Sequence, residues 1–136
     1  MAIVGYPYAI HDPYINAGIV GKLRNMGVNV ITSDNVSPRT LKLERSGINK
    51  RLFWTFSDRT LRTARYFNRR SDIDGIIHLT AFGCGPDSIV DRFIQLSNSN
   101  NKPFISLTVD EHSGEAGLIT RIEAFVDMVK RKKRSR

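Results

Sequence analysis

The sequence predicts an α/β fold built on a doubly wound parallel sheet, and two observations support this. Four short apolar segments of strand length alternate with segments whose apolar residues recur at helical spacing. The connections are short, so we expect consecutive strands to be parallel and joined by right-handed helical crossovers. The length of 136 residues suits one domain, and we expect residues 1–136 to form it.

A helix separates the first two predicted strands. Residues 2–5 predict the first strand and residues 28–32 the second. Between them Asp12-Pro13 marks a turn, and apolar residues from Ile15 onward follow helical spacing until Gly27 ends the helix. The first 32 residues therefore predict a βαβ unit.

The middle of the chain predicts two helices separated by an aromatic segment. A short helix is expected after Ser37-Pro38, ending near Arg45. Residues 52–56 could form a strand, but helix or loop that packs on the sheet is the preferred interpretation. The second helix is expected to start with Ser57-Asp58 as its cap and to reach about Asn68.

Arginines are concentrated on this second helix and on its end. Three of them share a face at helical spacing, which is typical of an exposed solubilising face. The alternative is a docking face for another domain or an anionic ligand. The arginines are Arg59, Arg62, Arg65, Arg69 and Arg70, of which Arg62, Arg65 and Arg69 share the face.

The last third of the chain predicts two further strands, each followed by a helix. The strands are expected at 74–80 and 103–109, and the helices from about 86 to 97 and from about 114 to 131. In the first of these helices we expect Ile89, Val90, Phe93 and Ile94 to face inward.

The four strands are expected to form a flavodoxin-like, doubly wound sheet of order 2-1-3-4, with helices on both faces. The loops at 5–16, 80–88 and 110–117 then converge at one edge of that sheet.

The formal net charge of +8 is concentrated at one end of the chain. Residues 130–136 hold six of the 21 Lys and Arg residues, and we expect this basic tail to be solvated. No known nucleic-acid-recognition motif accompanies the tail, which argues against a nucleic-acid partner. No apolar run is long enough to cross a membrane, and one cysteine indicates a reducing compartment, so a cytoplasmic location is expected.

That cysteine, Cys84, lies between two glycines where a predicted strand gives way to a helix. Pro86 is typical of a first helical turn, and Asp87 and Ser88 are expected to accept hydrogen bonds from its unpaired N–H groups. Open α/β sheets bind ligands at this edge, and the helix dipole there favours the thiolate.

Several simple roles for Cys84 are excluded by spacing. A phosphatase loop needs Arg six residues after the cysteine, where this chain has Val90. A dithiol redox pair needs a second cysteine. A dyad with His11 or His112 is allowed by loop convergence, and His78, inside a strand, is expected to be a core or hydrogen-bonded residue. The polar candidates at the edge are Tyr6, His11, Asp12, Gly83, Gly85, Asp87, Asp110, Glu111, His112 and Glu115.

Three blocks, around residues 5–16, 77–87 and 110–125, resemble the C-terminal part of the 2-hydroxyacyl-CoA dehydratase superfamily. Within it, they are most similar to the CoA enzyme activase-related, double-cubane cluster branch. The most specific blocks are Phe-Gly-Cys-Gly-Pro-Asp at 82–87 and Thr-Arg-Ile-Glu-Ala-Phe at 120–125. The resemblance extends over nearly the whole chain.

The resemblance implies that Cys84 is one ligand of an iron–sulfur cluster, 4Fe–4S or double-cubane, shared with other domains. The chain would then be the C-terminal module of a longer protein, with no cluster of its own and no activity alone. The alternative is a short relative that has lost the cluster. The parent would be a dehydratase-like lyase or a cluster-dependent reductase, with an ATP-dependent activator protein as partner and an acyl-CoA as substrate. The other polar candidates would be substrate-side groups or would support the ligand.

Two other functions stay open. The chain could be an interaction or nucleotide-binding module that uses the arginine-rich helix and the basic tail, or a complete cysteine-dependent enzyme.

Overall fold

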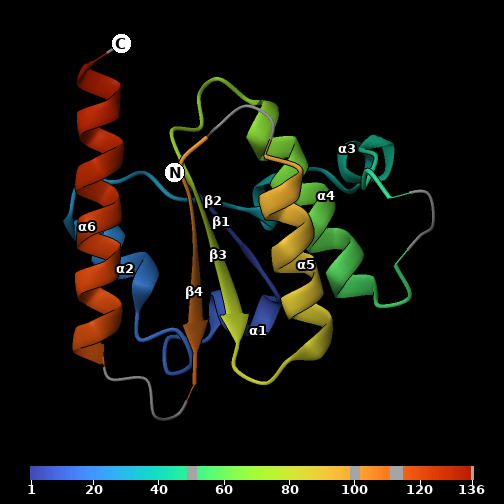
Figure 1. Cartoon of the computed structure of the whole chain (residues 1–136), viewed down its shortest axis with the longest axis horizontal. Coiled ribbons are helices and arrows are strands. Elements are labelled where there is room, and N and C mark those ends of the chain that lie inside the picture. The colour runs from blue at the N-terminus through green and yellow to red at the C-terminus, as the bar shows by residue number, and fades with distance from the viewer. Residues whose placement is uncertain (49–51, 99–101, 111–114, 136) are drawn as a thin grey trace.

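In a computed structural model that describes residues 1–48, 52–98, 102–110 and 115–135, four strands form one parallel sheet in the order β2-β1-β3-β4 (Figure 1). The strands are β1 (Ala2–Gly5), β2 (Ile31–Thr32), β3 (Ile76–Ala81) and β4 (Phe104–Val109). The helices are α1 (Pro7–His11), α2 (Ile19–Asn25), α3 (Pro38–Leu43), α4 (Thr55–Arg69), α5 (Gly85–Leu96) and α6 (Glu115–Arg134), and a 3-10 turn, η1, spans Ser33–Asn35.

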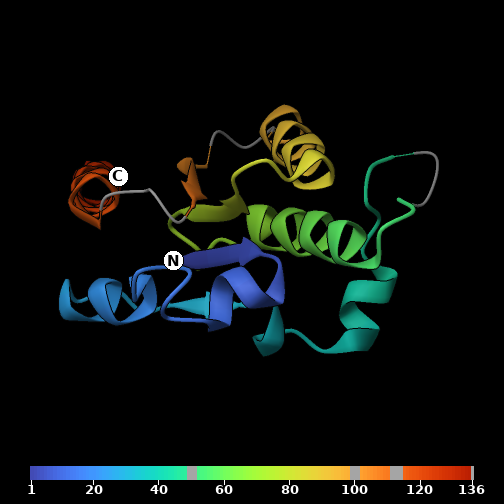
Figure 2. The same ribbon diagram turned by 90° about the horizontal axis from the view of Figure 1, so that it is seen from below.

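Helices cover both faces of this sheet, because successive strand residues point to opposite sides. Ile3, Ile77 and Leu107 pack with α1, α2 and α6, whereas Ala2, Val4 and Ile76 belong to the apolar cluster of α3, α4 and α5. Figure 2 shows α4 and α5 on one side of the sheet and α2 and α6 on the other. The predicted flavodoxin-like, doubly wound arrangement is confirmed.

The segment between β1 and α2 differs from the prediction. It contains α1, and the helix expected from Ile15 begins only at Ile19. The reason is Asn16, whose buried amide donates to the carbonyls of Ala9 and Ile10 while its Oδ1 accepts from the backbone N–H groups of Gly18 and Ile19. This side chain ties α1 to the start of α2 and delays the second helix by a turn.

The second strand is shorter than expected. It pairs with β1 only at Ile31 and Thr32, although the apolar pattern begins at residue 28. Thr32 then caps η1, with its hydroxyl accepting from Asp34 N–H, so the chain leaves the sheet at this residue.

The aromatic segment is loop and helix as predicted, but it packs on the sheet only in part. Leu52 packs against the apolar cluster that contains Ala2 and Val4, whereas Phe53 is 91% exposed. The predicted start of the helix is wrong. The helix α4 starts at Thr55, before the predicted cap at Ser57-Asp58, so Ser57 is buried inside the helix. The short helix after Ser37-Pro38 is confirmed, with Ser37 Oγ accepting from Thr40 N–H and α3 ending at Leu43.

The arginine face of α4 is only partly the exposed surface that we expected: the side chain of Arg69 is 61% exposed, whereas Arg62 and Arg65 are half-buried. Segment 44–47 covers it: Arg62 and Arg69 bind the backbone carbonyl and the carboxylate of the buried Glu44, respectively. A Cβ on Gly47 would overlap the guanidinium of Arg65, which shows how closely the two segments approach. The arginine face therefore holds a loop of this same chain.

The last two helices differ from prediction in detail. Ile89, expected to face inward, is 49% exposed, whereas Val90 and Ile94 are buried as predicted. Residues 130–134 continue α6 and do not form a separate basic tail; Lys130 donates to Met26 O, and Lys133 pairs with Asp74 at 3.0 Å. Among the described residues, no helix is long and apolar enough to span a membrane.

Lys102 holds the end of α4 against the strand that follows α5. Its Nζ donates to the backbone carbonyl of Phe67 in the last turn of α4 and to those of Arg70 and Ile73 in the segment that follows. We expect Lys102→Met to lower the free energy of unfolding by about 1–2 kcal/mol, because these carbonyls lose a cationic donor. Urea unfolding measures this loss. The control is Lys133→Met, which removes an exposed ion pair and should lower the free energy of unfolding by less than about 0.5 kcal/mol.

Candidate functional site

Cys84 lies at the carboxyl edge of the sheet, between the end of β3 and the start of α5, as the sequence predicted. Its backbone N–H donates to Ala81 O at 3.2 Å, closing a turn in which Gly83 has a φ of +75°. A residue with a side chain rarely adopts that conformation. The turn places the thiol, which is half-buried, at the first turn of α5.

The first turn of α5 is not capped as predicted, because neither Asp87 nor Ser88 accepts from its backbone N–H groups. Within the described residues no side chain caps this helix: Asp87 turns inward, and Ser88 Oγ donates to Cys84 O at 3.0 Å. A Cβ added to Gly83 or Gly85 would meet no heavy atom within 4 Å. The turn therefore has open space on both sides of the cysteine and uncapped N–H groups beside it.

Two tyrosines that follow β1 lie near this turn. Tyr6 is buried, its hydroxyl is 2.6 Å from Ser57 Oγ of α4, and its ring lies edge-on to Tyr8 with centroids 5.9 Å apart. Burial raises the pKa of Tyr6, the bond to Ser57 opposes this, and the nearby Asp87 and Cys84 raise it further. Burial and the nearby Cys84 also raise the pKa of Tyr8. Both phenols stay protonated near neutral pH and can donate hydrogen bonds.

A buried histidine contacts two carboxylates of α5, the helix that begins at this turn. His78 of β3 is fully buried, with Nε2 3.2 Å from Asp87 Oδ1 and Nδ1 2.8 Å from Asp91 Oδ1. Burial lowers the pKa of His78, but the hydrogen bonds and charges of the two carboxylates raise it more, so it lies above 6.5. Burial raises the pKa of Asp91, but its bonds to His78 and other groups lower it more, to a value below 3.8.

The sequence analysis expected a hydrogen-bonded His78, which is confirmed, but it missed both partners. The signal was present: Asp87 and Asp91 are four residues apart on one face of a helix that packs on β3.

The two candidates at the end of α1 face other partners. His11 Nε2 is 2.6 Å from Asp34 Oδ2, and Arg59 pairs with the same carboxylate. Asp12 Oδ1 accepts from the backbone N–H of Tyr14 at 2.9 Å and so forms a local turn. The structure shows no His11–Cys84 contact within the described residues.

Two of the remaining candidates, Asp110 and Glu115, line a cavity on the same edge of the sheet. It has a volume of about 440 Å³, and Pro13, Tyr14, Asp110 and Leu118 are among the residues that line it. Glu115 also lines it and pairs with Lys22 at 2.6 Å. For the described residues the expected loop convergence thus occurs in two places. Tyr6 and Tyr8 lie near Cys84 and Asp87, and residues 13–18 share a cavity with residues 109–110 and 115–118. Glu111 and His112 lie outside the described residues.

The described residues offer one thiolate to an iron–sulfur cluster and do not complete a site. Cys84 is the only cysteine of the chain, and no group of three or more His, Cys, Asp or Glu in the described segments could hold a metal ion. Clusters of the 4Fe–4S type are held by about four thiolates. The open space and uncapped N–H groups beside Cys84 fit one ligand of a cluster whose other ligands come from elsewhere.

Comparison with known proteins gives one family match. Residues 1–36, about a quarter of the chain, match the family described as CoA enzyme activase uncharacterised domain (DUF2229). The match contains β1, α1, α2 and β2, and with them Tyr6, His11 and Asp12. Neither the curated proteins nor the solved structures gave a match. Over residues 1–36 this chain is similar to the CoA enzyme activase family.

Proposed function

We propose that this chain is the C-terminal α/β module of a CoA enzyme activase-related protein and that Cys84 is one ligand of an iron–sulfur cluster, 4Fe–4S or double-cubane. The observation that carries the proposal is a half-buried thiol at the carboxyl edge of the sheet, between two glycines with open space around them. The remaining ligands belong to preceding domains of the same protein.

The surroundings of Cys84 suit an anionic group. The uncapped N–H groups at the start of α5 present partial positive charge, and the missing side chains of Gly83 and Gly85 let an inorganic centre approach the backbone. The charge of Asp87, the acid closest in sequence, is compensated by His78. Tyr6 and Tyr8 add protonated phenols near the thiol.

A cluster at this edge would supply low-potential electrons to a dehydratase-like lyase or a cluster-dependent reductase. An ATP-dependent activator protein would be the electron donor, and an acyl-CoA the substrate. The residues of this chain would hold the ligand and limit access of water to it. The chain on its own would have no activity, because one thiolate does not hold a cluster.

The alternative, an interaction module that uses the arginine-rich helix, has less support. Arg62 and Arg69 are engaged with Glu44 of the same chain, which leaves less of that helix for a partner.

The test is the iron content of the full-length protein, purified and reconstituted under anaerobic conditions. We expect Cys84→Ser to lower the iron bound per chain to below about half of the wild-type value and to bleach the visible absorbance, because no other cysteine of this module can replace the ligand. Ser88→Ala changes the same helical turn without touching the thiol and should leave both signals unchanged. Full iron content and absorbance in Cys84→Ser would refute the proposal.

A further inference from the structure

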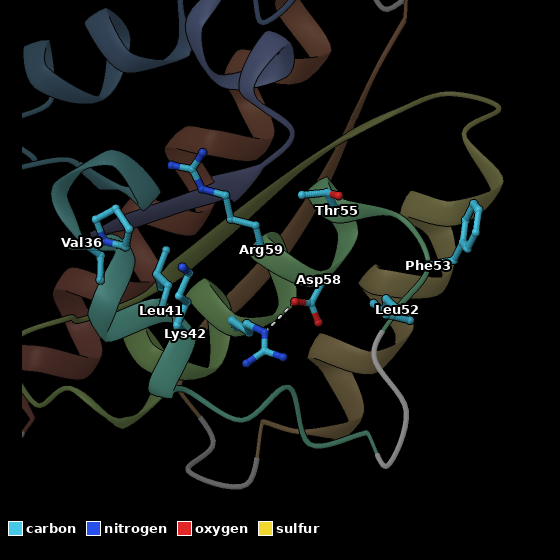
Figure 3. A pocket seen from close by; sticks show the side chains of 10 residues that line it. Val36, Leu41, Lys42, Leu52, Phe53, Thr55, Asp58 and Arg59 are labelled. Atoms are coloured by element: carbon cyan, nitrogen blue, oxygen red, sulfur yellow. Dashed lines mark hydrogen bonds and ion pairs between the residues drawn. The ribbon is translucent and has the colours of Figure 1, made fainter.

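A cavity of about 600 Å³ lies between α3 and the first turns of α4, apart from the Cys84 turn. Figure 3 shows Leu41 and Lys42 of α3 on one side, Leu52 and Phe53 on the other, and Asp58 of α4 between them. This volume falls within the range that small-molecule sites occupy in proteins. It is formed by residues to which the proposed function gives no role.

The walls of the cavity combine an apolar surface with positive charge. Val36, Leu41, Leu52 and Phe53 supply the apolar part. Phe53 is 91% exposed, so its ring is available to a ligand, and it lies edge-on to Trp54 with centroids 5.9 Å apart. An apolar or aromatic body placed against these side chains would remove them from water.

One of the cationic side chains is left without a partner. Arg59 pairs with Asp34 at 2.8 Å, and Arg62 Nε donates to Asp58 Oδ2 at 2.7 Å. Lys42, which is exposed on α3, has no hydrogen bond or ion pair with any described residue. The lining therefore has one more cation than its internal pairs use, which favours an anionic group in the ligand.

The cavity and Tyr6, which lies near Cys84, are contacted by different residues of the first turn of α4. Phe56 contacts the Tyr6 ring, with centroids 5.9 Å apart, and Ser57 bonds to Tyr6. Thr55 and Asp58, on either side of that pair in the sequence, line the cavity. A ligand can therefore occupy the cavity whether or not Cys84 carries a cluster.

We propose that this cavity binds a small molecule in which an apolar or aromatic body carries one phosphate or carboxylate group. The body lies against Leu52 and Phe53, and Lys42 Nζ binds the anionic group. Two sources supply this chemistry, a nucleotide with a planar base and a medium-chain fatty acid, and they differ in the shape of the body.

Trp54 is the only tryptophan of the chain and contacts Phe53, so its fluorescence reports on the cavity. The probes are adenosine monophosphate, octanoate, adenosine and inorganic phosphate. We expect the monophosphate or the octanoate to change the fluorescence with saturation below about 1 mM. If adenosine monophosphate is the probe that binds, adenosine and phosphate should each bind at least about tenfold more weakly, because each lacks one half of that ligand.

Lys42→Met keeps the length of the side chain and removes its charge, and we expect it to weaken the bound probe about tenfold. Lys130→Met, on the distant α6, is the matched control and should leave the affinity unchanged. Cys84→Ser should also leave it unchanged, which separates this result from that of the cluster test.

Saturation by the monophosphate alone assigns a planar body to the ligand, and saturation by octanoate alone assigns an acyl body. The proposal is overturned if neither probe saturates, or if Lys42→Met binds as tightly as Lys130→Met.

Discussion

His78→Leu is expected to lower the free energy of unfolding by about 3–5 kcal/mol at pH 6, because it leaves the Asp87 carboxylate buried without its cation. Asp87 is 1% exposed, and its only hydrogen bond from a side chain in the described residues comes from His78. Leucine has a similar volume, so the loss reports on charge rather than on a cavity. Thermal and urea unfolding of both proteins measure the effect.

The pH dependence identifies the cause. The pKa of His78 is raised above 6.5, so its contribution is complete below pH 6.5 and is lost as the pH rises through the raised value. The pKa of Asp91 is lowered from 3.8, so its contribution is complete above pH 3.8 and is lost as the pH falls through the lowered value. The free energy of unfolding of the wild type should therefore exceed that of His78→Leu by the largest amount between pH 3.8 and 6.5.

A double variant provides the control. His78→Leu combined with Asp87→Leu removes the stranded charge and should recover much of the lost stability, since an apolar pair can replace a buried ion pair at little cost. If the loss in free energy of unfolding of the double variant equals the sum of the losses of the two single variants, His78 and Asp87 are not coupled.

Gly5→Ala is expected to lower the free energy of unfolding by about 3 kcal/mol or more, through backbone strain and overlap together. Gly5 has a φ of +154°, and a Cβ built on it would lie 2.5 Å from the backbone oxygen of Leu79 on the neighbouring strand. A backbone atom in the middle of the sheet cannot move aside as a flexible side chain can. Chemical unfolding measures the loss, and the position of Tyr6, the next residue, should shift with it.

The matched control is Gly21→Ala. Gly21 lies inside α2, and a Cβ there would meet no heavy atom within 4 Å. Alanine should stabilise this helix by about 0.5–1 kcal/mol, because glycine gives up more chain entropy in a helix. Equal effects of the two substitutions, in sign and size, would contradict the role of Gly5.

The sheet was predictable because its strands are continuous apolar runs separated by turn residues. Residues 2–5 and 76–81 are buried along nearly all of their length, as central and doubly covered strands are. The strand order was predictable because the connections are short and crossovers between parallel strands are right-handed. Boundaries set by single side chains were not predictable: Asn16 delays α2 by binding backbone groups on both sides, and helical spacing carries no sign of this.

The candidate site was predictable in place but not in its supporting contacts. Cys84 lies at the predicted edge because the strand, turn and helix around it are local in sequence. The bond between Tyr6 and Ser57 spans 51 residues, and the cover of Arg65 by Gly47 depends on how a loop folds over α4. Such contacts follow from tertiary packing, so periodicity and capping rules do not reach them.

The central claim, that Cys84 is a cluster ligand in the full-length protein, is tested most directly by the alkylation rate of this one thiol. Iodoacetamide is added under anaerobic conditions to the iron-loaded protein and to the same protein after iron chelation, and mass spectrometry follows the peptide that contains Cys84. Removal of iron should accelerate alkylation at least about tenfold, because a metal-bound thiolate is protected. Equal rates before and after chelation would contradict the claim.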